Sequence, residues 1–195
     1  MFLAVLLIFV TRGFWSTKIG EGLVCKQEIT PSDALLIENF DPAYSVFERA
    51  AALQRTGVAP RVFVHVRASP EPGIPDEVSK GFAEVMARIA HLQKLELIPI
   101  EEIEPISMNA AKQIRDFLTA QHVKSIVVVS PDFRSRRSAL VYKKVMTPVD
   151  ISVGCVPVFA RMTPENWIES THGIQEVGLQ FVKFQYYRFY VLPLF

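Results

Sequence analysis

The sequence predicts a three-layer α/β domain in which helices cover both faces of a mostly parallel sheet of about five strands. From Asp33 onward, short apolar runs alternate with longer segments whose apolar residues recur at helical spacing. Half of the 195 residues are hydrophobic and 21% are charged, which suffices for one substantial core. A single domain of Rossmann-like architecture is therefore expected.

Five apolar runs are expected to form the strands, and four segments between them the helices. The strands are expected at residues 33–37, 61–66, 95–100, 123–129 and 150–156, and the helices at residues 42–56, 76–92, 107–121 and 133–145. Residues 123–129 are rich in β-branched side chains, which favours a central strand. Ser107 is a suitable N-cap for the third helix, because its hydroxyl can accept a free backbone N–H.

Composition divides the chain into three parts. Residues 1–27 form a hydrophobic segment with a linker, residues 28–160 the α/β domain, and residues 161–195 an aromatic-rich helical segment. In that last part, six aromatic side chains fall within residues 181–190. Such side chains suit packing on the sheet and also anchoring at a membrane interface, so both alternatives stand.

The N-terminal run MFLAVLLIFV is apolar throughout and has no basic residue before it. A membrane-spanning helix needs about 20 residues, so the run indicates part of a truncated membrane anchor or signal anchor whose natural start lies upstream. The alternative is an ordinary buried hydrophobic segment. Arg12, Lys18 and Lys26 follow the run and, by the positive-inside rule, favour a cytoplasmic position for the rest of the chain.

Charge, cysteine and histidine patterns narrow the function classes. The formal net charge of +1 argues against a dedicated nucleic-acid binder, and the four histidines show no ligand spacing, so no metal site is predicted. Cys25 and Cys155 are too far apart for a CxxC motif. We expect Cys155 to be a buried small apolar residue, although a disulfide stays open in an oxidising compartment.

The candidate site lies at the carboxyl ends of the strands, where open α/β sheets bind their ligands. The polar residues expected there are Glu38, Asn39 and Asp41 after the first strand, Glu104, Ser107 and Asn109 after the third, and Ser130 to Arg137 after the fourth. No glycine-rich dinucleotide fingerprint occurs among them, so a nicotinamide cofactor is not expected and no other cofactor can be named.

Arg134, Arg136 and Arg137 stand out because they fall where the fourth strand is expected to give way to a helix near Phe133. A helix start has free N–H groups and a positive dipole end, and guanidinium groups add donors that suit phosphate or carboxylate. The pattern predicts an anion site. The alternative is a solvated helix face paired with acids such as Asp132 and Glu104.

Several segments resemble the YdcF-like family of unknown function, the group of SanA/ElyC-like envelope proteins. They are SDALLI, FERAAALQRTGVAPRVFV, EEIEPISMNAAKQIRDFL and VVVSPDFRSRRSALVY, and the resemblance covers roughly residues 32–160. It implies a membrane anchor before the domain, a periplasmic position on a bacterial inner membrane, and a role in the cell envelope.

Matched and departing positions refine what the resemblance implies. Asp33, Ala34, Arg49, Ala50, Asn109 and Arg137 match the family pattern. The glycine pairs after the first two strands are replaced by Glu38-Asn39 and by His65-Val66-Arg67, a threonine by Ala110, and a histidine by Arg134. Since arginine cannot act as a neutral base at pH 7, binding is favoured over catalysis.

The leading prediction is a membrane-anchored domain that binds an anionic small molecule. Arg134 and Arg137 would clamp the anion, Asn109 and Ser107 would orient it, and Arg136, Ser130 and Asn39 are further candidate binding residues. One alternative is a hydrolase or transferase acting on phosphorylated or glycosyl envelope precursors, with Glu104 or Asp41 as general base. The other is a non-catalytic envelope assembly protein, and no particular protein partner can be named.

Overall fold

A five-stranded parallel sheet forms the centre of the domain. The computed structural model describes residues 2–71 and 73–195, with side chains from residue 11 onward. The strands are β1 (Ala34–Ile37), β2 (Arg61–Arg67), β3 (Leu95–Ile100), β4 (Ser125–Pro131) and β5 (Ser152–Val158). Their order is β3-β2-β1-β4-β5 and every pairing is parallel, which confirms the predicted α/β, Rossmann-like architecture.

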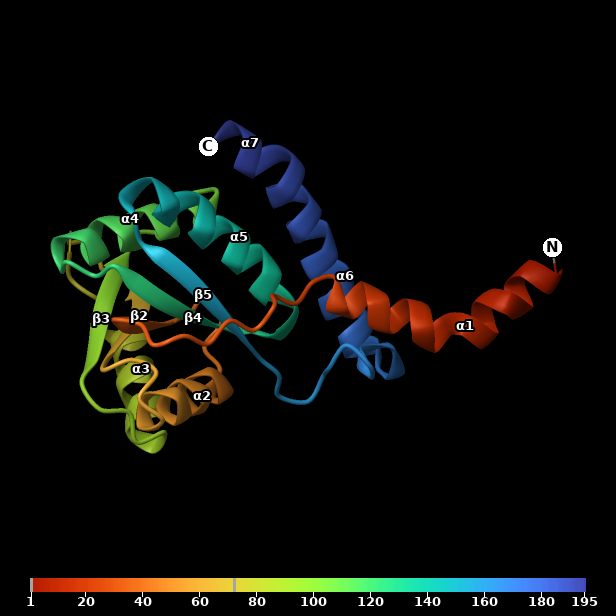
Figure 1. Ribbon diagram of the computed structural model, residues 1–195, viewed down its shortest axis with the longest axis horizontal. Helices are drawn as coiled ribbons and strands as arrows, with labels where there is room; N and C mark the ends of the chain where they lie inside the picture. Colours follow the sequence, from red (N-terminus) through yellow and green to blue (C-terminus); the bar gives the residue numbers. More distant parts are fainter. Residues whose placement is uncertain (1, 72) are drawn as a thin grey trace.

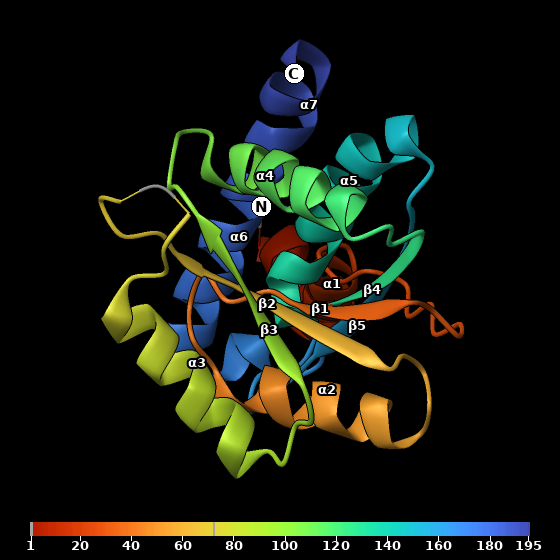
Figure 2. The ribbon, with the colours of Figure 1, turned by 90° about the vertical axis from the view of Figure 1, so that its left-hand side faces the viewer.

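Helices cover both faces of the sheet (Figure 1 and Figure 2). On one face lie α2 (Tyr44–Arg55) and α3 (Glu77–Ile89), and on the other α4 (Ile106–Ala120) and α5 (Ser135–Met146). Each helix buries one stripe: in α2, for example, Val46, Phe47 and Ala50 are fully buried against the sheet. The strands themselves are apolar runs because both of their faces are covered.

One helix cap differs from the sequence expectation. Pro105, and not Ser107, occupies the N-cap of α4, and the carboxylate of Glu104 accepts the N–H of Ile106 at 3.2 Å. The fourth helical segment begins near Phe133, as expected: a 3-10 turn (Asp132–Arg134) comes first, and α5 begins at Ser135.

The C-terminal segment packs on the domain with one face and exposes the other. It consists of the 3-10 turn η3 (Trp167–Glu169), α6 (Thr171–Tyr186), a π-helical turn (Tyr187–Val191) and α7 (Leu192–Leu194). The buried side chains of its inner face are Val177, Phe184, Tyr187 and Val191. Its outer face exposes Phe181, Val182, Tyr186, Phe189 and Tyr190.

The N-terminal helix α1 (Phe2–Glu21) extends away from the sheet, with the N-terminus at its far end (Figure 1). Its C-terminal half is attached to the domain, since the Trp167 indole Nε1–H donates to the Ser16 carbonyl at 2.9 Å. The predicted anchor run, residues 1–10, lies outside the residues whose side chains are described. Within the described residues, we find no helix with the length and apolar character needed to cross a bilayer.

The linker after α1 is joined to the sheet by a disulfide between Cys25 and Cys155, with the two Cα atoms 6.4 Å apart. The expectation that Cys155 is simply a buried apolar residue is thus corrected: it is buried, and it is bonded to Cys25. Just beyond, the Glu28 N–H donates to the Cys155 carbonyl at 2.9 Å, so the linker follows β5. Because the strand and the linker are far apart in sequence, spacing could not predict this pairing.

Candidate anion-binding site

The strand order reverses between β1 and β4, and a pocket opens near the carboxyl ends of these strands. The pocket has a volume of about 340 Å³. Its polar walls come from the β1 loop (Asp41), the β3–α4 loop and the start of α4 (Glu102, Glu104, Ser107), the 3-10 turn and α5 after β4 (Arg134, Arg137), and the end of α6 with the π-helical turn (Lys183, Tyr186, Tyr187). We call this hollow the anion pocket.

Arg137 is the least compensated charge in the anion pocket. Its side chain is buried, with 4% of the residue exposed, and its guanidinium makes no hydrogen bond or ion pair within residues 11–71 and 73–195. Its Cζ atom lies 5.3 Å from the centre of the Tyr187 ring. Burial and the neighbouring charge of Arg134 lower the pKa of Arg137, while the charges of Glu38, Tyr187 and Asp41 offset part of this effect.

Arg134 lies beside Arg137 and has one counter-charge. Its Nη2 is 2.6 Å from the Asp41 Oδ2, and its guanidinium lies over the Phe40 ring at 5.4 Å. The Asp41 side chain is 82% exposed, so this partner sits at the solvent edge of the pocket. The Nε–H groups of Arg134 and Arg137 are both buried without partners.

The acidic side chains of the anion pocket are all engaged. Asp41 pairs with Arg134, Glu102 pairs with Arg67, and Glu104 accepts the Ile106 N–H. Lys183, by contrast, has no ion pair within the described part of the chain, and neither has Arg137. The pocket consequently contains two cations that form no ion pair among the described residues, although the charges of Glu38 and Asp41 act on Arg137 at longer range.

The buried carboxylate of Glu38, which follows β1, binds one serine at the end of β4 and one in α5. Glu38 is 1% exposed, and its carboxylate accepts hydrogen bonds from the hydroxyls of Ser130 and Ser138, the latter at 2.7 Å from both carboxylate oxygens. The parallel register that pairs Ile37 with Val129 puts Glu38 next to Ser130. Ser130, a predicted binding residue, is fully buried, and its hydroxyl donates to the Glu38 carboxylate.

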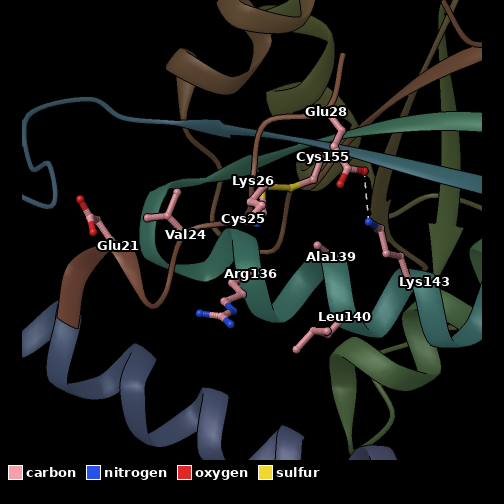
Figure 3. A pocket seen from close by; sticks show the side chains of 10 residues that line it. All are labelled: Glu21, Val24, Cys25, Lys26, Glu28, Arg136, Ala139, Leu140, Lys143 and Cys155. Carbon is pink, nitrogen blue, oxygen red and sulfur yellow. Dashed lines mark hydrogen bonds and ion pairs between the residues drawn. A yellow bond between two sulfur atoms is a disulfide. The ribbon is translucent and has the colours of Figure 1, made fainter. Parts of the chain in front are cut away.

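Arg136 does not line the anion pocket, so the three arginines do not form one cluster. Its Nη1 donates to the Gly22 carbonyl at 2.7 Å, and its guanidinium lies 5.5 Å from the Phe184 ring. It lines a separate hollow of about 300 Å³ beside the disulfide, where Lys143 and Glu28 form an ion pair at 3.1 Å (Figure 3). We call this the disulfide pocket.

Two backbone N–H groups near the start of α5 have protein acceptors. The Arg136 N–H donates to the Leu23 carbonyl at 3.1 Å, and the Phe133 N–H, in the preceding turn, to the Asp132 carboxylate at 2.6 Å. Burial raises the pKa of Asp132 to about 6. These two N–H groups are therefore not free for an anion.

The other predicted residues have different places. Ser107 lines the anion pocket, and its N–H donates to the Tyr187 hydroxyl at 3.1 Å. Asn109 lies outside it and holds the loop before α4, donating to the carbonyls of Ile103 and Glu104 at 3.1 and 3.0 Å. Asn39 lines a neighbouring hollow.

Sequence reasoning missed Lys183 and Tyr187. They come from the C-terminal segment, where the sequence indicates only that the aromatic residues suit packing or membrane contacts. No local pattern distinguishes them, since only the packing of α6 against α5 and the β3–α4 loop places them at the pocket.

The comparisons with known proteins add no relative. No protein-family model matches the chain, and the search of curated proteins finds no match either. The functional argument accordingly depends on the geometry of the pocket.

Proposed function

We propose that the chain is a YdcF-like α/β domain that binds an anionic, phosphate-bearing small molecule in the anion pocket. The observation that carries the proposal is Arg137, a buried guanidinium without a hydrogen bond or ion pair among the described residues. Burying a charge without a partner destabilises a fold, and a bound oxyanion would supply the missing acceptors. Lys183 adds a second cation at the same pocket.

Arg134 would join Arg137 in holding the anion. Its partner in the structure is the exposed carboxylate of Asp41, which bound phosphate oxygens can replace. A guanidinium presents a planar set of donors to which two phosphate oxygens fit at once. Ser107, on the wall of the same pocket, is the residue placed to contact further polar groups of the ligand.

Binding is proposed in preference to a hydrolase or transferase activity. The two carboxylates considered as general bases already have partners, since Asp41 pairs with Arg134 and Glu104 accepts the N–H of Ile106. The histidine that the resemblance would place near the anion is Arg134, which stays protonated and cannot accept a proton.

We propose that the domain is membrane-anchored through its N-terminal segment and acts in the bacterial cell envelope, on the periplasmic side. The Cys25–Cys155 disulfide supports this side, because disulfides persist in oxidising compartments, whereas Arg12, Lys18 and Lys26 favour the cytoplasm. Alkylation of the cysteine thiols in protein taken directly from cells distinguishes a periplasmic from a cytoplasmic position. Blocked cysteines support the periplasmic position, and freely alkylated cysteines exclude it.

A role as an envelope interaction protein is the second candidate. The observation that favours it is the outer face of α6 and the following turn, which exposes Phe181, Val182, Tyr186, Phe189 and Tyr190. Exposed apolar surface of this kind is typical of contacts with membranes or other proteins.

The test is thermal melting of the full chain in detergent with increasing inorganic phosphate. A ligand that binds only the native state raises stability by about 2.7 kcal/mol at a hundredfold excess over Kd. For a domain of this size that corresponds to a Tm increase of about 2–4 °C per kcal/mol. Arg137→Met should abolish the increase.

Arg136→Met is the matched control, because it removes the neighbouring arginine from the disulfide pocket and should leave the phosphate effect intact. An equal phosphate effect in Arg137→Met and in the unaltered protein would contradict the proposed site. No effect in any folded form would leave the interaction role as the better proposal.

A further inference from the structure

A second hollow lies beside the anion pocket. It has a volume of about 270 Å³ and shares Phe40 and Glu102 with the anion pocket. Its other polar walls are Asn39, His65, Arg67 and Ser79. The Phe40 ring borders both hollows. Its centre lies 5.4 Å from the Arg134 guanidinium carbon and 4.3 Å from the centre of the His65 ring. We call the second hollow the neutral pocket.

The neutral pocket has no uncompensated charge. Its two ionised groups, Arg67 and Glu102, are paired with each other, with the Arg67 Nε donating to the Glu102 Oε2 at 3.0 Å. His65 is neutral, because burial lowers its pKa to about 3 and the charge of Arg134 adds to the effect. In this respect the neutral pocket differs from the anion pocket, where Arg137 and Lys183 have no ion pair with any of the described residues.

Two polar groups of the neutral pocket lack partners among the described residues, and one of them, the Asn39 Oδ1, is fully buried. The His65 Nε2 accepts the Asn39 backbone N–H at 2.8 Å, so the proton of the neutral ring is on Nδ1. This Nδ1–H has no acceptor among the described residues. Asn39 is 8% exposed and donates from Nδ2 to the His65 carbonyl at 3.3 Å, which leaves its Oδ1 as a buried acceptor without a donor.

A hydroxyl group is the chemical partner that satisfies both, because it donates one hydrogen bond and accepts another. The pocket also has apolar walls, Phe40 and Phe82 among them, that can cover the carbon atoms bearing such hydroxyls. Small-molecule sites usually combine apolar walls with a few oriented polar groups and measure about 300–1,000 Å³. The two adjoining hollows together fall in this range.

We infer that the neutral pocket receives the hydroxyl-bearing part of the ligand, so that the ligand is a sugar phosphate or glycosyl phosphate. The phosphate occupies the anion pocket, and the sugar lies across Phe40 against Asn39 and His65. This inference depends on the proposed anion site and adds the class of molecule that the site takes.

The experiment measures dissociation constants of the full chain in detergent by calorimetry. The probes are inorganic phosphate, glucose 1-phosphate, N-acetylglucosamine 1-phosphate, glycerol phosphate and free glucose. At least one of the hydroxyl-bearing phosphates should bind tenfold or more tightly than inorganic phosphate, while free glucose alone binds weakly. A tenfold difference corresponds to about 1.4 kcal/mol, the size expected for one or two added hydrogen bonds.

Two variants assign the difference to the neutral pocket. Asn39→Leu removes the acceptor at similar volume, and Ser79→Trp fills the hollow from the start of α3 while keeping the backbone N–H that Asp76 accepts. In both, the sugar phosphates should bind no more than threefold more tightly than inorganic phosphate, and phosphate affinity should stay unchanged. That unchanged affinity also shows that the variants are folded.

The results separate the two proposals. Equal affinity for inorganic phosphate and for all three organic phosphates overturns the sugar-phosphate inference and leaves the anion site standing. A preference that survives in both variants overturns it as well. Absence of binding by every phosphate overturns the anion site itself, and the inference with it.

Discussion

Arg136 and Arg137 are neighbours in sequence and opposites in environment. Arg136 is exposed, donates to the Gly22 carbonyl and lies against Phe184, beside the disulfide (Figure 3). Arg137 is buried beside Arg134 and has no hydrogen bond among the described residues. One step along a helix turns a side chain by about 100°. The two neighbouring arginines thus differ in whether protein groups among the described residues accept their hydrogen bonds, and the one without such partners lines the anion pocket.

The largest expected effect concerns the disulfide side. Replacing both Cys25 and Cys155 by Ala should lower the free energy of unfolding by about 2–5 kcal/mol, because the crosslink closes a very long loop in the unfolded chain. The sequence separation of the two cysteines is 130. Urea denaturation of the full chain in detergent measures the change.

The control for this variant is reduction. A reducing agent should destabilise the unaltered protein to a similar extent and should leave the double variant unchanged. If the double variant were as stable as the oxidised protein, the disulfide side would not be the stabilising one, and the comparison would fail.

The next effect concerns His65 in the neutral pocket and depends on pH. His65 has a pKa lowered to about 3 in the folded protein and an ordinary value near 6.5 in the unfolded chain, so the unfolded state binds the proton more readily. The contribution of His65 to stability is thus complete above pH 6.5 and declines as the pH falls toward 3. The decline approaches about 1.4 kcal/mol per pH unit.

His65→Gln isolates this contribution, because glutamine can still accept the Asn39 N–H and does not titrate. Urea denaturation between pH 7 and pH 4 should show a flatter pH dependence in the variant than in the unaltered protein. Parallel curves would mean that His65 is not buried in the neutral form.

The smallest effect compares the two arginines directly, without ligand. Arg137→Met should raise the free energy of unfolding by about 1–2 kcal/mol, because it removes buried donors that have no partners. Arg136→Met should lower it by about 1 kcal/mol or less, because it removes an exposed contact. Denaturation midpoints in phosphate-free buffer measure both. Shifts of the same sign would show that the two sides of α5 do not differ in this way.

The fold was largely predictable because its strands are continuous apolar runs. Each of the five occurs within two residues of its expected bounds, since strands covered on both faces need apolar side chains at every position. The strand ends were less predictable. β4 continues through Pro131 because Ser130 and Pro131 pair with Pro157 and Val158 of β5, and this extension buries Ser130.

The candidate site was predictable only in its location. Asp41, Ser107, Arg134 and Arg137 line one pocket, as their positions after the strands indicated. Asn109 does not line the pocket, because its side chain donates to carbonyls of the preceding loop. The role of His65 was not predictable, because nothing in the neighbouring sequence indicates that its Nε2 accepts the N–H of Asn39. The sequence marks His65 only as a departure from the family pattern.

The alternation of strands and helices and the arginines after the fourth strand follow from local composition and spacing. Tertiary packing determines which arginine is buried without a hydrogen bond among the described residues, that α6 brings Lys183 to the same pocket, and that Cys25 meets Cys155. Those outcomes depend on the rotation of α5 against the sheet and on contacts between segments far apart in the chain, and neither is encoded in any short stretch of residues.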